Sequence, residues 1–252
     1  MPYTRLNNAG ELAKRLRKLE KFVIPTTTPT LDTTAAVINA DGVDVTVTTF
    51  ASWATGDHVI VTGSGRMELN RLGTKPGVSG PIPVVRPWSL AQASGAEIAK
   101  AQKNDLGYIE DAGGTFSSSS SKTGIGAANA GGAIAYLEGD TPEQQFAWSQ
   151  RESNLRNILA AYGIDEDSIK GAGTDADPYR GLVSADNIGG QTNFCLRASG
   201  LLVNGKYLYF DLWNCTPEVS VSAQFVAKGQ PTTWGLSVKY TDMLAYILAA
   251  PI

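Results

Sequence analysis

The strongest constraint on the fold is an alternation of apolar and polar residues in the last quarter of the sequence. In residues 218–228 every second side chain is apolar, namely Val219, Val221, Ala223, Phe225 and Ala227. Residues 233–240 repeat the pattern with Trp234, Leu236, Val238 and Tyr240. Successive side chains of a strand point to opposite faces, so each segment predicts a strand with one apolar and one polar face. The sequence therefore predicts an antiparallel sheet that is buried on one side.

A β-hairpin is predicted just before these strands, at Asn204 and Gly205. Both residue types tolerate the positive φ angles of a two-residue type I′ turn. In a hairpin without a bulge, Cys195 would pair with Asn214, one position away from Cys215. The only two cysteines of the sequence would then lie on opposite faces. We therefore expect two reduced thiols, since a disulfide between them would need a bulge.

Two helical segments are predicted outside the sheet. The segment Thr141–Gln144 combines an N-cap threonine, a proline at the first helical position and a capping-box glutamine. One packed helix is expected there, over about 141–163. Residues 1–24 are expected to form a basic amphipathic arm, either docked on a neighbouring subunit, packed on its own domain or frayed. The candidates for inter-subunit contact are Leu12, Arg15, Leu16, Lys18 and Leu19.

The rest of the sequence indicates a single β-rich domain over residues 25–252. Residues 43–48 alternate and residues 58–62 form a short apolar run, which is typical of a small antiparallel β module. Near residues 107–132, glycine pairs and a serine run predict a loop-rich Gly/Ser insertion. The expected fold class is mainly β with flanking α: an antiparallel β-sandwich or barrel protomer with one packed helix.

No arrangement of residues points to catalysis, a cofactor or a metal. His58 is the single histidine and has no orienting acid on a rigid frame beside it. The two cysteines are too far apart in sequence for a zinc motif. The acidic loop 165–178 lacks the EF-hand pattern, which leaves a solvated loop or a looser calcium site. We expect a protein that is not an enzyme and that has no cofactor.

Charge and hydropathy exclude two further classes of protein. The formal net charge is −3, which argues against an overall cationic nucleic-acid binder. It does not exclude DNA that passes nearby without being gripped. No apolar run is as long as the roughly 18 residues that span a membrane, so no membrane partner is expected.

Three segments resemble the tail tube (major tail) proteins of tailed bacteriophages. They are Phe50–Val61, the predicted helix 141–163, and the closing pair Pro217–Val226 and Pro231–Tyr240. The resemblance implies a structural virion protein whose protomers join their sheets into hexameric rings, which stack into a tube that conducts DNA. It implies as partners the protein itself, other tail proteins, and double-stranded DNA held without sequence specificity. It implies assembly in the bacterial host cytoplasm and a final place in the virion tail.

On this resemblance, the polar row of the closing strands would line the lumen. Its members are Glu218, Ser220, Ser222, Gln224, Ser237 and Lys239. A lining of mixed sign without arginine would let DNA slide instead of holding it. The alternative is that this row faces solvent on a monomer.

Two other functions remain open from the sequence. One is a different structural virion protein, such as a head decoration or connector subunit. The other is a carbohydrate-binding or adhesion β-sandwich, in which Trp53, Trp88 and Trp234 would supply sugar-stacking platforms.

Overall fold

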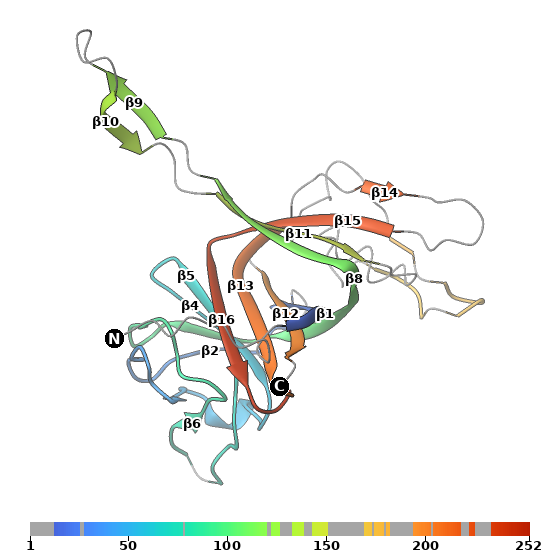
Figure 1. Ribbon diagram of the computed structural model, residues 1–252. Helices are drawn as coiled ribbons and strands as arrows, with labels where there is room; N and C mark the ends of the chain where they lie inside the picture. Colours follow the sequence, from blue (N-terminus) through green and yellow to red (C-terminus); the bar gives the residue numbers. More distant parts are fainter. Residues whose placement is uncertain are drawn as a thin grey trace.

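The computed structural model describes thirteen stretches of the chain, within which antiparallel β-structure predominates as the sequence predicted. The described residues are 13–25, 28–77, 79–119, 122–126, 133–138, 143–150, 169–172, 174–178, 180–181, 194–202, 204–217, 222–224 and 233–252. Two closed sheets, the large barrel and the small barrel, account for most of them (Figure 1).

The large barrel is formed by strands from both ends of the chain. Its sheet contains β1 (Ala13–Val23), β8 (Gln102–Ser119), β11 (Glu143–Gln150), β12 (Phe194–Leu202), β13 (Tyr207–Pro217), β14 (Ser222–Gln224), β15 (Thr233–Tyr240) and β16 (Asp242–Leu248). The strand order is β14-β15-β11-β8-β1-β12-β13-β16. In addition β15 pairs with β13, through Thr216 with Lys239 and Pro217 with Val238. This last pairing closes the sheet and leaves β16 outside the closed ring of strands.

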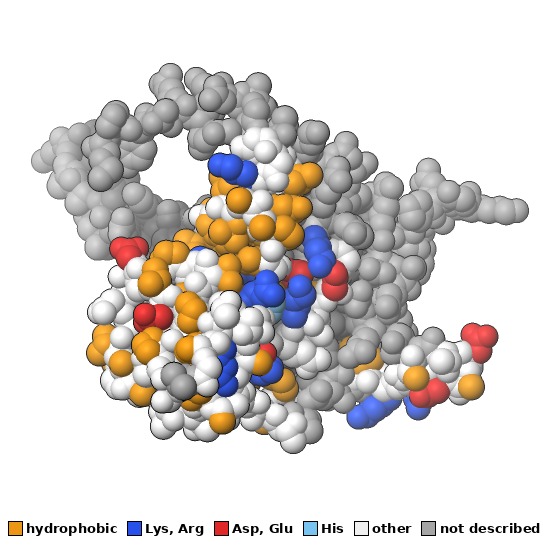
Figure 2. Space-filling model, turned by 90° about the horizontal axis from the view of Figure 1, so that it is seen from below, with side chains coloured by type: hydrophobic (Ala, Val, Ile, Leu, Met, Phe, Trp, Pro, Cys, Tyr) orange, Lys and Arg blue, Asp and Glu red, His pale blue; other side chains and the backbone are white. Residues whose placement is uncertain are grey.

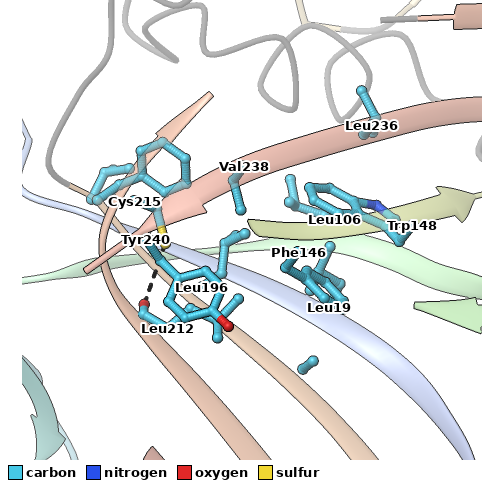
Figure 3. Packing of buried hydrophobic residues seen from close by; sticks show 13 residues of the cluster. Leu19, Leu106, Phe146, Trp148, Leu196, Leu212, Cys215, Leu236, Val238 and Tyr240 are labelled. Carbon is cyan, nitrogen blue, oxygen red and sulfur yellow. Dashed lines mark hydrogen bonds between the residues drawn. The ribbon is translucent and has the colours of Figure 1, made fainter. Parts of the chain in front are cut away.

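The interior of the large barrel is filled with apolar side chains from all of its closed strands (Figure 3). Burying such side chains contributes about 1.5–3 kcal/mol each, which makes this cluster the main source of barrel stability. Its members include Leu19, Leu106, Phe146, Trp148, Leu196, Leu212, Cys215, Leu236, Val238 and Tyr240.

The small barrel is inserted in the chain between β1 and β8. Its strands are β2 (Leu31–Thr33), β3 (Asp44–Val45), β4 (His58–Gly63), β5 (Arg66–Arg71), β6 (Ile82–Pro83) and β7 (Glu97–Lys100). The sheets β2-β7-β4-β5 and β3-β6 are joined by isolated bridges between Thr34 and Val47 and between Leu72 and Val84. A single 3₁₀ turn, η2 (Phe50–Ser52), lies between β3 and β4.

The two barrels pack against each other through apolar side chains on their outer faces. Phe22, Cys195 and Trp213 of the large barrel meet Ile60 and Leu69 of the small barrel in one buried cluster. The small barrel has a separate interior cluster that includes Trp53 and Trp88.

The predicted insertion is β-structure wherever it is described. Residues 107–119 belong to β8, and β9 (Lys122–Gly126) pairs with β10 (Ala133–Glu138). Figure 1 shows the β9–β10 hairpin projecting away from both barrels. The expectation of a loop is therefore wrong for these strands, and residues 120–121 and 127–132 lie outside the described residues.

Both helix predictions are wrong for the residues that the structure describes. Residues 13–23 form β1, in which Leu19 points into the large barrel and Phe22 points to its outer face. Residues 143–150 form β11, in which Phe146 and Trp148, two positions apart, both point inward. Tertiary packing on two faces overrides the helical spacing and the capping signal. Residues 1–12 and 151–163 lie outside the described residues.

The hairpin before β13 differs from its predicted register by one residue. Leu202 donates its N–H to the carbonyl of Lys206 at 2.8 Å, and Gly205 has a φ of 81°. This is a three-residue turn with a glycine in the left-handed region instead of a two-residue turn. Leu201 consequently pairs with Tyr207.

The cysteines are free thiols, as the sequence predicted, and a register shift that the sequence did not predict lies beside Cys195. Phe194 pairs with Cys215, and the register shifts next to Cys195, opposite Asn214 with its φ of 52°. Cys195 is buried between the barrels and Cys215 inside the large barrel. The two thiols thus lie on opposite faces of the sheet.

Candidate assembly surface

The most unusual surface feature is the edge strand β16. It pairs with β13 from Asp242 opposite Trp213 to Leu248 opposite Tyr207. Among the described strands it has no second neighbour, so its outer backbone groups lack a strand partner. Long unpaired edges are templates for another strand, and proteins usually cover or pair them.

One face of β16 is an exposed apolar row, formed by Met243, Ala245 and Ile247. The side chain of Met243 is 42% exposed and that of Ile247 is 48% exposed. They occupy every second position of the strand, so all three side chains point to the same side. Burying such a row against a partner would be favourable, at about 25 cal/mol per Å² of apolar surface.

The opposite face of β16 meets a buried charge network, formed by Glu68, Arg86, Arg197 and Asp211. Arg197 donates from Nε to Oδ1 of Asp211 at 2.7 Å and from Nη2 to Oδ2 at 2.9 Å. Arg86 Nη2 lies 3.8 Å from Oδ2 of Asp211. Arg86 Nη1 donates to Oε1 of Glu68 at 2.6 Å. The network thus connects the two barrels with equal numbers of positive and negative side chains.

Tyr246 of β16 joins this network. Its hydroxyl donates to Oδ2 of Asp211 at 3.0 Å. Burial and the Asp211 carboxylate raise the pKa of Tyr246 above its ordinary value, so the hydroxyl stays a donor. Burial alone would lower the pKa of Arg197, but the same carboxylate raises it. The guanidinium is therefore held charged inside the protein.

The predicted lumen-lining residues of β15 lie on the outer face of the large barrel. Leu236 and Val238 point inward, so Ser237 and Lys239 point outward. Gln145 of β11 pairs with Lys239. Ser117 of β8 pairs with Gln145, and its hydroxyl donates to Oε1 of Gln145 at 3.3 Å. We name Ser117, Gln145, Ser237 and Lys239 the polar outer face.

The side chains of the other four predicted lining residues lie outside what the structure describes. Ser222 and Gln224 lie on β14, of which only the backbone is described. Glu218 and Ser220 lie outside the described residues.

The predicted arm residues belong to the large barrel where they are described. Leu19 is buried in its interior and is not available to a neighbouring subunit. Lys18 forms ion pairs with Glu20 at 2.8 Å and with Asp105 at 3.0 Å. Arg15 and Leu16 lie on β1 with only their backbone described, and Leu12 lies outside the described residues.

The described surface carries both signs of charge. In Figure 2, Lys and Arg side chains adjoin Asp and Glu side chains instead of forming one basic surface. Within the part of the chain that the structure describes, no three His, Cys, Asp or Glu side chains are grouped to hold a metal ion. No helix among the described residues is long and apolar enough to cross a membrane.

His58 is half-buried at the contact between the barrels. Its ring centroid lies 4.8 Å from that of Phe22, and its Nε2 has no hydrogen-bond partner among the described residues. Burial first, and then the charges of Arg197, Lys103 and Arg71, lower the pKa of His58 from 6.5 to about 3. His58 therefore takes up a proton below pH 6.5 in the unfolded chain. In the folded protein it does so only below about pH 3.

Stability is accordingly expected to fall as the pH drops from about 6.5, with a slope of up to about 1.4 kcal/mol per pH unit. His58→Phe should flatten this slope between about pH 6.5 and 5, where most carboxylates stay ionised. Urea unfolding of both proteins at several pH values measures it. A slope that persists unchanged in the variant contradicts the assignment to His58.

The candidate surface thus combines the β16 edge, the exposed apolar row and the polar outer face. All three are features of strands and not of a pocket with convergent reactive groups. This chain matches no protein-family model and no curated protein sequence.

Proposed function

We propose that the protein is a structural subunit that assembles with copies of itself into stacked, hexameric rings, as the tail tube of a bacteriophage through which DNA passes. The β16 edge carries the proposal. Its seven residues, Asp242–Leu248, form a regular ladder with β13 on one side and have no described strand partner on the other.

A second copy of the chain is the occupant that best fits this edge. A strand added beside β16 would satisfy its free N–H and C=O groups and extend the sheet from one subunit to the next. The exposed apolar row would be buried in the same step. Repeated head-to-tail around an axis, such a contact closes a ring when the rotation from one subunit to the next divides a full turn.

The polar outer face suits a lumen in this arrangement. Its described side chains are uncharged apart from Lys239. A surface with so little positive charge contacts phosphate weakly and releases few counterions, so DNA would slide past it. The predicted lining by Ser237 and Lys239 is part of this proposal.

The burial of two of the three candidate tryptophans weighs against a carbohydrate-binding protein, and the side chain of the third, Trp234, lies outside the described ones. Trp53 is 2% exposed and Trp88 is 1% exposed, so neither can stack on a sugar. Another structural virion protein would use the same edge, and its position in the particle would distinguish it from a tube subunit.

Ile247→Lys is expected to reduce the assembled fraction about tenfold or more, since burying an Ile contributes about 1.5–3 kcal/mol and each 1.4 kcal/mol changes an equilibrium tenfold. Val37→Lys is the matched control, because Val37 is 58% exposed in the small barrel, between β2 and β3. Negative-stain microscopy and light scattering measure rings and tubes. Wild-type protein that stays monomeric at high concentration, or an Ile247→Lys variant that assembles normally, contradicts the proposal.

A further inference from the structure

Three of the four side chains on the inner face of β16 contact the small barrel or the network that it completes. Asp242 accepts a hydrogen bond from Arg66 of β5 at 2.6 Å. Leu244 packs against the apolar cluster between the barrels. The ring of Tyr246 lies under the guanidinium of Arg86, 5.3 Å from its Cζ to the ring centroid. Three successive inward positions of one strand are thus in contact with the same neighbouring unit.

The large barrel alone does not hold β16 in this way. The barrel closes through the pairing of β13 with β15, and β16 lies beyond that ring of strands. The large barrel supports β16 through the ladder with β13, the stacking of Tyr246 on Tyr209 and the hydrogen bond from Tyr246 to Asp211. The inward contacts with the small barrel are added to these. A strand paired on one side only tends to fray, because its ends lose few interactions when they open.

Arg86 is the central residue of this support. It is 5% exposed and lies between Glu68 of its own barrel and Asp211 of the other. Its guanidinium also contacts the ring of Trp213, 5.6 Å from the centroid. It donates to the carbonyl of Leu69, which anchors it to β5. A fixed, fully charged group in this place stabilises both the Asp211 carboxylate and the ring of Tyr246.

We propose that the small barrel serves to position β16 for assembly, with Arg86 as the positioning residue and Tyr246 as the group through which it acts. The small barrel holds the inner face of the strand, which keeps the outer backbone edge straight and the exposed apolar row turned outward. The positioning is a property of the single subunit. Only its consequence for ring formation rests on the proposed function.

Hydrogen exchange of unassembled subunits tests the positioning directly. Tyr246→Phe removes the hydrogen bond to Asp211 and keeps the ring, and Arg86→Met removes the guanidinium and keeps an apolar side chain. Both are expected to speed amide exchange in residues 242–248 about tenfold, the factor that corresponds to one lost hydrogen bond to a charged group. Exchange in β12 should stay at the wild-type rate.

Lys75→Met is the matched control. Lys75 is a cation of the small barrel that donates to the carbonyl of Trp53 at 2.6 Å and lies over the ring of Phe50, without contact to β16. Its loss should leave exchange in residues 242–248 unchanged. If Arg86→Met accelerates β12 and β16 together, it has loosened the whole protein, and Arg66→Met, which removes the bond from β5 to Asp242, decides.

The proposal is overturned if Arg86→Met and Arg66→Met leave exchange in β16 at the wild-type rate, or if Lys75→Met accelerates it equally. Ring formation by the same variants is the second readout, and both variants should lower it while Lys75→Met does not. If wild-type subunits form no rings, the proposed function fails, while the exchange rates still decide whether the small barrel positions β16.

Discussion

Asp211→Asn is expected to lower the free energy of unfolding by about 3–5 kcal/mol, the cost of removing one partner of a buried ion pair. Asp211 is fully buried and accepts two hydrogen bonds from Arg197 and one from Tyr246. The amide has no charge and one acceptor oxygen, so the guanidinium of Arg197 would stay buried without its counter-ion. Urea unfolding, followed by tryptophan fluorescence, measures the loss.

Asp105→Asn is the control for this prediction. Asp105 is an ion-pair partner of Lys18, with a side chain that is 52% exposed. Exposed pairs contribute about 0–1 kcal/mol, so the same chemical change should cost little there. Equal losses in the two variants would contradict the role assigned to Asp211. A double variant, Asp211→Leu with Arg197→Met, should recover part of the stability because no unpaired charge remains at this pair.

Gly114→Val is expected to cost about 3 kcal/mol, at the upper end of the range for overpacking a core. A Cβ atom at Gly114 would lie only 2.5 Å from Cζ of Phe146. The ring of Phe146 cannot move aside, because it is stacked between Phe116, at 4.6 Å between ring centroids, and Trp148, at 5.3 Å. Gly114 therefore gives the ring of Phe146 its space inside the large barrel. Thermal and urea unfolding measure the effect.

Gly77 provides the control for Gly114. A Cβ atom there meets nothing within 4 Å, and its φ lies outside the left-handed region. Gly77→Val should change stability by less than about 0.5 kcal/mol, as at most surface positions. Phe146→Leu combined with Gly114→Val should cost less than the sum of the two single changes. Additive costs would show that the two residues do not compete for the same space.

The two faces of β15 were predictable from its strict alternation, whereas β11, whose pattern conflicts with a local signal, was not predicted as a strand. In β15, Leu236 and Val238 alternate with Ser237 and Lys239, and the structure confirms both faces. In β11, Phe146 and Trp148 alternate in the same way, but the capping motif at Thr141–Gln144 favoured a helix. A capping motif contributes about 1 kcal/mol, whereas two buried aromatic side chains contribute several times more.

The candidate site was predictable only in part, because its key residues are charged groups in apolar surroundings. Arg86 lies in a loop between β6 and β7, and Asp211 lies in a central strand. Nothing in the local sequence of either indicates that they meet. Charged residues are ordinarily read as exposed, so Arg197 and Asp211 carried no signal of burial. Residues 243–248 of β16 form a continuous apolar run, so the sequence alone does not indicate that Met243 and Ile247 are exposed while Leu244 packs between the barrels.

The place of the small barrel in the chain has a consequence for how proteins of this architecture can diverge. Val23, the last residue of β1, pairs directly with Gln102, the first residue of β8. The chain leaves and re-enters the large barrel at neighbouring positions, as it would in a simple hairpin. A recombination event could therefore exchange or delete everything between these two residues without rerouting any other strand. Descendants of one ancestral barrel can differ by a whole appended unit while they share the same strand order.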